Sequence, residues 1–224
     1  MNSITEHKIF TPFTIGRVSL RHRVVMAPLT RLRSEQPGNV PGPLLAQYYE
    51  QRTSPGGLII TESAEITPEA SAYEGAPGIY SEEQVTGWST GTEAIHRKGG
   101  FVFLQLWHVG RVSHPDLTGV PPVSASATES SDILVYTRNG PLPFPRSRAL
   151  QIQELPEFVD LYRTATIRAL AAGFDGVEVL AAGGYLLSGI LAEHWDVIQN
   201  EATEADSKSG KPMFGNSFPA PTAK

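Results

Sequence analysis

The stretch Phe101–Arg111, FVFLQLWHVGR, joins an apolar run to side chains that can bind and orient a ligand. The run is typical of a β-strand buried on both faces, because such strands lack polar alternation. Four polar or aromatic groups follow at its end: Gln105, Trp107, His108 and Arg111. A parallel α/β barrel builds its binding site from groups at the carboxyl ends of its strands. A core strand with an incidental polar end fits this stretch equally well, so the neighbouring segments must decide.

Several kinds of chemistry are excluded by residue types and motifs that the sequence lacks. The chain has no cysteine, which rules out a disulfide framework, a thiolate metal site and a cysteine nucleophile. No GxGxxG follows a strand, and HExxH, P-loop and GxSxG motifs do not occur. The net charge of −5 and the absence of a basic run argue against nucleic-acid binding. The N-terminus lacks a signal-peptide core and no apolar run is long enough to cross a membrane. We therefore expect a cytoplasmic protein without a membrane segment.

Strands and helices alternate around this stretch. Apolar strands are predicted at Arg23–Thr30, at Leu58–Ile66, in the first part of Phe101–Arg111, and at Phe174–Leu180. Helices are predicted at Leu44–Arg52, from Ser81 to Gly99, and at Leu155–Ala172. Such alternation implies a parallel sheet with right-handed crossovers, either half of a barrel or an open doubly wound sheet.

The remaining segments are less regular. Residues Ile4–His22 are interpreted as a small hairpin, and Tyr185–Ala192 as one or two helical turns. The Pro-, Ser- and Gly-rich segment Val112–Gln151 predicts a lid or a partly disordered loop, with a short strand at Asp132–Thr137. Residues Gln199–Lys224 have no apolar period, so we divide the chain into a domain over 1–198 and a disordered polar tail over 199–224.

Five sequence blocks in order resemble the old yellow enzyme family. They are MAPLTR at Met26–Arg31, LIITESAEITPEA at Leu58–Ala70, APGIYSEEQ at Ala76–Gln84, QLWHVGR at Gln105–Arg111 and AGFDGVEVLAAGGYLL at Ala172–Leu187. The resemblance implies a (β/α) eight-fold TIM barrel and an FMN ene-reductase that takes NADPH and an α,β-unsaturated carbonyl substrate. Several blocks are similar to fungal members, including those of alkaloid and other secondary-metabolite pathways such as the ergot-alkaloid dehydrogenases.

The resemblance assigns four residues to the flavin. Pro28 and Thr30 match the first strand where it meets the flavin ring, and Ser63 matches a small residue beside it. Gln105 matches the glutamine that hydrogen-bonds the pyrimidine edge, where an amide can donate and accept at once. Thr30 could equally make only a strand-end backbone bond. For Gln105, an inherited flavin-facing position, with or without its ligand, is favoured over a purely structural polar strand end.

The resemblance also assigns residues to the substrate. Trp107 matches a residue that lines the substrate pocket, and Tyr185 matches the tyrosine that protonates the substrate carbon. A phenol can give up a proton in a dry pocket without being ionised beforehand. In active relatives two further side chains, His and Asn or His and His, polarise the substrate carbonyl, and here those positions are Leu180 and Gly183. Without that pair, packing is favoured over catalysis as the explanation of Tyr185.

Other charged residues near the strand ends are interpreted as structural. They are His108, Arg111, Glu62, Asp175 and Glu178.

The chain is also short for a complete barrel, which usually takes roughly 250 residues. We therefore expect an incomplete barrel of about four βα units with an N-terminal hairpin. The family's later strands supply the arginine and glycine-rich amides that hold the FMN phosphate, and the sequence offers no counterpart. Two open sheet edges would be exposed, which predicts that a homo-oligomer covers them.

Three functions remain open, and the sequence favours the first. The first is a truncated member that is inactive as a dehydrogenase, since the carbonyl pair and the phosphate site are both missing. The second is an active ene-reductase completed by a partner chain. The third is a non-redox isomerase or cyclase that uses Tyr185 as an acid, and a pure binding protein is a weaker fourth.

Overall fold

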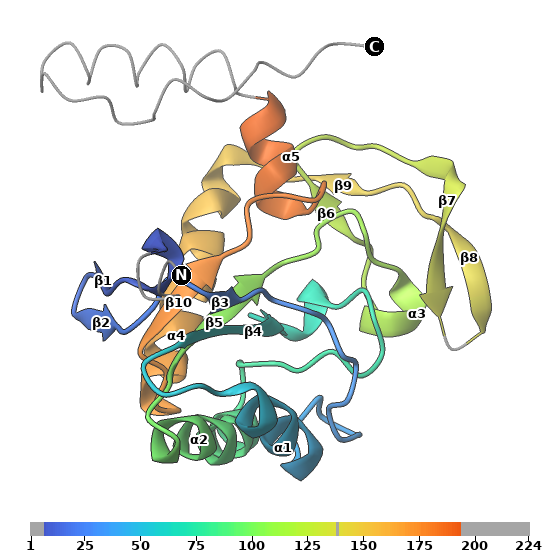
Figure 1. Ribbon diagram of the computed structural model, residues 1–224. Helices are drawn as coiled ribbons and strands as arrows, with labels where there is room; N and C mark the ends of the chain where they lie inside the picture. Colours follow the sequence, from blue (N-terminus) through green and yellow to red (C-terminus); the bar gives the residue numbers. More distant parts are fainter. Residues whose placement is uncertain (1–6, 138, 194–224) are drawn as a thin grey trace, which may run out of the picture.

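The computed structural model describes residues 7–137 and 139–193, and its centre is a four-stranded parallel sheet (Figure 1). The strand order is β10-β5-β4-β3. The strands are β3 (Val25–Met26), β4 (Leu58–Glu65), β5 (Phe101–Trp107) and β10 (Gly176–Val179). Every neighbouring pair is parallel, which confirms the predicted βα alternation and the half-barrel architecture.

Three helices pack on one face of this sheet and form the main core. They are α1 (Pro43–Arg52), α2 (Glu82–Arg97) and α4 (Leu155–Ala171). Tyr49 and Trp88 from the helices are almost completely buried against Leu104 of β5. All three helices start within one residue of the predicted position, because each apolar face repeats with helical period.

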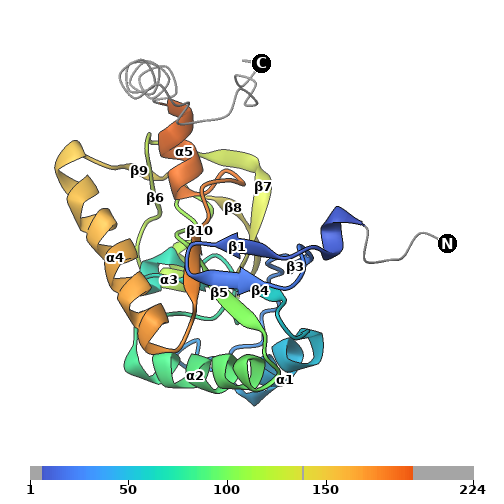
Figure 2. The same ribbon diagram turned by 60° about the vertical axis from the view of Figure 1, so that its left-hand side comes forward.

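A hairpin covers the opposite face, as Figure 2 shows. It is formed by β1 (Phe13–Ile15) and β2 (Val18–Leu20), within the segment predicted as a hairpin. Val18 and Leu20 bury themselves against Leu58 at the start of β4. The hairpin therefore closes the amino-terminal end of the sheet and leaves the carboxyl end for the site.

The capping box predicted at the start of α2 is present. The Ser81 hydroxyl accepts from the backbone N–H of Gln84 at 3.3 Å, and the Gln84 side chain accepts from the backbone N–H of Ser81 at 3.0 Å. Gln84 also donates to the carbonyl of Gly38 at 2.8 Å, so the cap fastens a distant loop to the helix.

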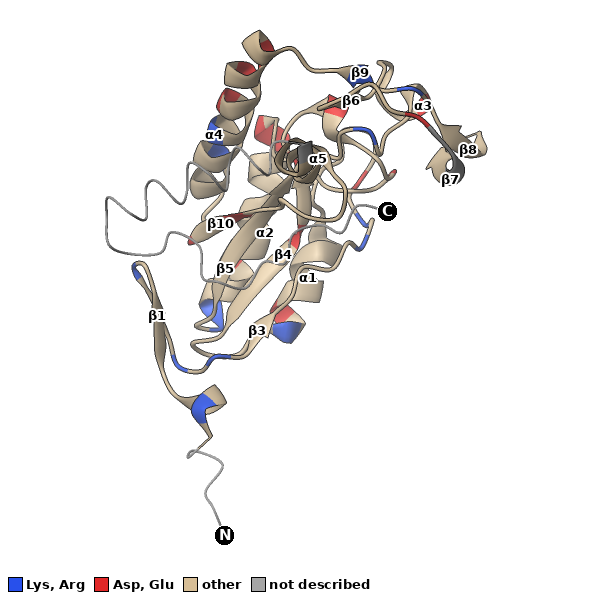
Figure 3. Cartoon of the chain, turned by 90° about the horizontal axis from the view of Figure 1, so that it is seen from above, with Lys and Arg blue, Asp and Glu red and all other residues tan. Residues whose placement is uncertain are grey.

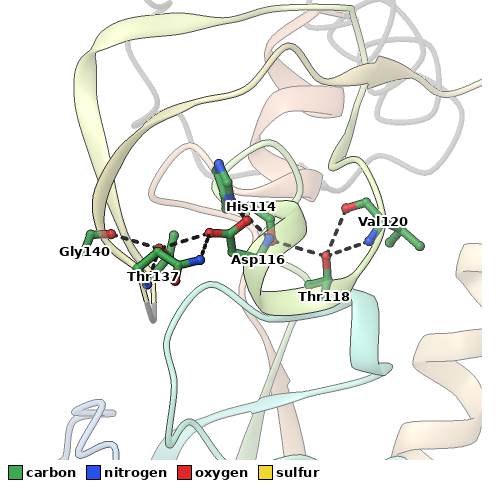
Figure 4. Close-up of polar contacts among 7 residues, drawn as sticks. His114, Asp116, Thr118, Val120, Thr137 and Gly140 are labelled. Carbon is green, nitrogen blue, oxygen red and sulfur yellow. Dashed lines mark hydrogen bonds and ion pairs between the residues drawn. The ribbon is translucent and has the colours of Figure 1, made fainter.

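The long connection between β5 and α4 is more ordered than the sequence suggests. It contains α3 (Pro115–Thr118), β6 (Val123–Ser124), β7 (Ser130–Thr137), β8 (Gly140–Phe144) and β9 (Arg148–Ala149). Asp116 of α3 accepts from Asn139 at 2.7 Å and from Thr137 at 3.5 Å, so α3 is tied to the turn of the β7–β8 hairpin. Thr118 at the end of α3 donates to the carbonyl of Val120 at 3.0 Å (Figure 4). The short strand predicted at Asp132–Thr137 is confirmed as part of β7.

One expectation about the fold is corrected, and one concerns residues that the structure does not describe. The predicted first strand, Arg23–Thr30, is only two residues long in the structure, because Pro28 has no N–H with which to continue a ladder. The predicted tail and its boundary at residue 198/199 lie outside the described residues. The final helix α5 (Leu186–Glu193) matches the turns predicted after Tyr185.

No helix within the described ranges is long and apolar enough to cross a bilayer.

Candidate functional site

A row of three polar side chains crosses the carboxyl end of the sheet. Gln105 of β5 is in register with Ser63 of β4 on one side and with Glu178 of β10 on the other. The Ser63 hydroxyl donates to Oε1 of Gln105, and Nε2 of Gln105 donates to Oε1 of Glu178 at 3.0 Å. Side chains at one register level of a parallel sheet point to the same face, which is why three separate strands assemble this row.

The Gln105 amide retains capacity for a ligand. An amide has two N–H donors and two acceptor lone pairs, and Ser63 and Glu178 each use one of them. One donor and one acceptor are therefore left on a side chain that its neighbours hold in place. Gln105 is only 5% exposed, so these contacts fix its orientation in a nearly dry environment.

The segment after β3 reaches the same end of the sheet. The backbone N–H of Arg31 donates to Oε2 of Glu62 at 2.8 Å, and Glu62 is the neighbour of Ser63. Thr30 is consequently drawn to this end, where it is exposed, while Pro28 is half-buried. Burial raises the pKa of Glu62, whose remaining oxygen accepts from the hydroxyl of Tyr49. Glu62 thus has the structural role that the sequence indicates.

Three aromatic rings lie beside this row. Trp107 stacks on Tyr73 with ring centroids 6.0 Å apart, and it meets Tyr185 edge to face at 5.3 Å. Trp107 is 2% exposed, and its indole N–H finds no hydrogen-bond partner among the described residues. The site therefore holds one buried donor that a ligand oxygen could satisfy.

The Tyr185 phenol is protonated at neutral pH. Burial raises its pKa above the usual value of 10, and a hydrogen bond with Tyr73 raises it further. A neutral phenol whose proton is still present can act only as an acid, which is the role that the resemblance implies for Tyr185.

The two positions that would polarise a substrate carbonyl offer no side-chain donor. Leu180 follows β10 directly, and its backbone N–H is already used by the carbonyl of Leu106 at 3.0 Å. Gly183 is exposed, with a φ of +73° that places it in the left-handed region. The structure thus places Leu180 and Gly183 beside Tyr185. Neither residue has a side chain that could donate a hydrogen bond to a substrate carbonyl.

Two titratable groups outside this row have structural roles. His108 is 2% exposed, accepts from the backbone N–H of Gly110 at 3.0 Å, and packs on the Phe158 ring. Burial lowers the pKa of His108 to about 4, so its imidazole is neutral and structural, as the sequence analysis has it. Asp175 is structural as well, since its carboxylate accepts from the backbone N–H of Val102 at 2.9 Å.

Three residues at this end of the sheet are absent from the predicted site. Glu178 is interpreted from the sequence as structural, but it holds the Gln105 amide. Register supplies the missing signal, since Glu178 lies opposite Gln105 once β10 and β5 are paired. Tyr73 lies in a loop, and the buried Glu65 lies at the end of β4. No rule of sequence spacing predicts the contacts of their side chains.

The comparisons with known proteins agree with this geometry. The family model of the NADH:flavin oxidoreductase / NADH oxidase family matches residues 8–197. The chain is 45% identical over 181 residues to 12-oxophytodienoate reductase 1 of Oryza sativa subsp. japonica, covering 80% of this chain and 46% of that protein. It is 43% identical over 185 residues to the chanoclavine-I aldehyde reductase fgaOx3 of Penicillium roqueforti, covering 80% and 47%. These two identities are too similar to assign the chain to the plant or the fungal branch.

Solved structures give the same result. The old yellow enzyme homologue of Zymomonas mobilis superposes with a TM-score of 0.76 at 42% identity, covering 80% of this chain and 50% of that one. Morphinone reductase in complex with tetrahydroNAD superposes with a TM-score of 0.74 at 46% identity, covering 80% and 51%. The chain thus spans about half the length of the relatives that it matches. It belongs to the NADH:flavin oxidoreductase / NADH oxidase family, the FMN-dependent family of old yellow enzyme.

Proposed function

We propose that this chain provides the flavin-ring side of an old yellow enzyme site, with Thr30, Ser63 and Gln105 along the ring. The observation that carries this proposal is the row of Ser63, Gln105 and Glu178, which leaves Gln105 one donor and one acceptor. The pyrimidine edge of a flavin presents both acceptors and a donor, so the free groups of Gln105 match it. FMN, when bound, supplies the hydride chemistry between a nicotinamide and a substrate.

The substrate side of the proposed site is incomplete. Trp107 and Tyr185 would line the place of an α,β-unsaturated carbonyl, and Tyr185 would hold the proton for its carbon. The carbonyl oxygen itself would meet Leu180 and Gly183, whose side chains cannot donate a hydrogen bond. Losing one donor of such a site costs roughly 10²–10³ in rate. We therefore propose that this chain is inactive as an ene-reductase, whether or not it belongs to an alkaloid or other secondary-metabolite pathway.

The ring contacts can be tested without any turnover. Riboflavin has the flavin ring and no phosphate, so its affinity reports the ring side alone. We expect quenching of riboflavin fluorescence on titration with the chain, and a roughly tenfold weaker Kd for Gln105→Leu, since a lost buried hydrogen-bonding pair is worth about 1.4 kcal/mol.

The matched control is Gln153→Leu, which removes an exposed glutamine at the approach to α4. It should bind riboflavin as the unaltered chain does. Equal affinities for the chain and Gln105→Leu, or no binding by either, would refute a ring site at Gln105.

A further inference from the structure

Glu178 is the charged member of the row that crosses the carboxyl end of the sheet. Strand β5 has no charged residue and β10 has only Glu178, and Figure 3 shows red on β10 beside the uncharged β5. Glu178 is half-buried, and its Oε1 accepts from Nε2 of Gln105 at 3.0 Å. The parallel pairing of β10 with β5 holds the two residues opposite each other. A charged acceptor therefore lies against one end of the Gln105 amide.

The three members of the row differ in how they can form hydrogen bonds. A carboxylate only accepts, whereas a hydroxyl donates or accepts by rotating its proton. An amide side chain can be turned end for end, which exchanges its N–H donors with its carbonyl acceptor. Of the three side chains, only the carboxylate of Glu178 therefore admits a single direction of hydrogen bonding.

The direction at Glu178 determines the rest of the row. Because the carboxylate must accept, Gln105 presents Nε2 to β10 and Oε1 to β4. Ser63 is in register with Gln105 on β4, so it has to donate to Oε1, and this is the bond that the structure shows. Gln105 is 5% exposed, so an end of its amide that faced the wrong partner would be costly to leave unpaired.

We infer that Glu178 is a positioning residue that sets the direction of this row and so decides which side of Gln105 offers a donor to a ligand. The free N–H lies on the β10 side of Gln105, and the free lone pair lies on the β4 side. A cyclic imide edge, in which a carbonyl adjoins an N–H, matches this pair with its carbonyl toward β10 and its N–H toward β4. The ligand part of the inference rests on the proposed flavin-ring site, whereas the direction of the row does not.

Proton contacts of the Gln105 side-chain amide test the direction of the row without any ligand. Nuclear Overhauser effects from the Nε2 protons should be stronger to the β-protons of Glu178 than to those of Ser63. Glu178→Met removes the acceptor and keeps the length of the side chain, so both directions become possible and this preference should be lost. Ser63→Ala is the matched control, because it removes the other partner and should leave the preference for Glu178 intact.

The riboflavin titration gives a second readout. In Glu178→Met the amide is no longer held in one order, and a competent fraction of roughly one half raises the apparent Kd about twofold. In the Gln105→Leu background the same substitution should have no effect, because Glu178 acts through the Gln105 amide. A merely structural role of Glu178 would weaken binding in both backgrounds.

The possible results separate this inference from the proposed function. A stronger contact to Ser63 in the unaltered chain, an unchanged preference in folded Glu178→Met, or an equal loss of affinity in both backgrounds would each overturn the inference. If the unaltered chain binds no riboflavin, the ring site is refuted, and the proton contacts still decide the direction of the row. Far-UV circular dichroism checks folding. Glu178→Gln, whose amide can donate or accept, replaces Glu178→Met if that variant does not fold.

Discussion

Glu65 is a buried carboxyl whose ionisation opposes folding. It ends β4 with no exposed surface, and Asn39 donates to its Oε2 at 2.8 Å. Burial raises its pKa to about 8, and hydrogen bonds with Ser71 and Asn39 only partly offset this effect. The carboxyl is therefore mostly protonated at pH 7 in the folded chain.

The sign of the resulting pH dependence follows from the raised pKa. The unfolded chain loses the Glu65 proton near pH 4.5, whereas the folded chain keeps it until about pH 8. The contribution of this group to stability is complete below pH 4.5 and is lost as the pH rises to about 8.

At pH 7 the folded chain must keep a proton on Glu65 that the unfolded chain has lost, and this costs stability. The substitution Glu65→Gln removes that cost, because glutamine does not titrate. The amide can still accept from Asn39, so we expect the free energy of unfolding at pH 7 to increase by roughly 3 kcal/mol. The gain should vanish near pH 4. Urea denaturation at several pH values measures it, with the exposed Glu93→Gln on α2 as control. A gain that is the same at every pH would show that Glu65 does not titrate in this range.

At the same scale, the sequence identifies Ser63 and Gln105 but not the contacts that hold them. Both lie at strand ends, which periodicity locates. Glu178 completes the row because β10 pairs with β5 in a register that puts it opposite Gln105. The sequence does not give this register, which is known only once the two strands are seen paired. The roles of Pro28, Thr30, Ser63, Gln105, Trp107 and Tyr185 remain predictions that the ring titration and the activity measurement address.

Among the elements, α2 shows how a local signal can fix distant parts of the chain. Ser81 and Gln84 were predictable as a capping box, since side chain and backbone lie three residues apart. The bond from Gln84 to the carbonyl of Gly38 joins segments 46 residues apart and was not predictable. The same holds for the β7–β8 hairpin, which Asp116 ties to α3.

Substitutions at the cap separate these two roles. Ser81→Ala should lower the free energy of unfolding by about 1 kcal/mol, the usual cost of losing an N-cap. Gln84→Ala should cost more, because it removes a fully buried side chain that both completes the cap at the Ser81 N–H and donates to the carbonyl of Gly38. Denaturant unfolding of both variants measures the difference. Equal losses would mean that the Gly38 contact adds nothing to stability.

For the molecule as a whole, the alternation of strands and helices predicted a parallel sheet, and the resemblance to the old yellow enzyme family selected a partial barrel over an open doubly wound sheet. Strand β3 was overestimated, because apolar composition extends past Pro28 while hydrogen bonding does not.

The central claim is that this chain has a flavin-ring side but cannot polarise a substrate carbonyl. Enone-dependent oxidation of NADPH in the presence of added FMN tests it most directly, on the chain and on the variant Leu180→His with Gly183→Asn. Asparagine tolerates the positive φ at position 183 better than most residues, so the variant should fold.

We expect no turnover by the unaltered chain, because Leu180 and Gly183 give the carbonyl oxygen no donor. The double variant tests whether these two positions account for the missing activity. Turnover by the double variant alone would show that the missing pair is the sole defect. Turnover by the unaltered chain would contradict the account.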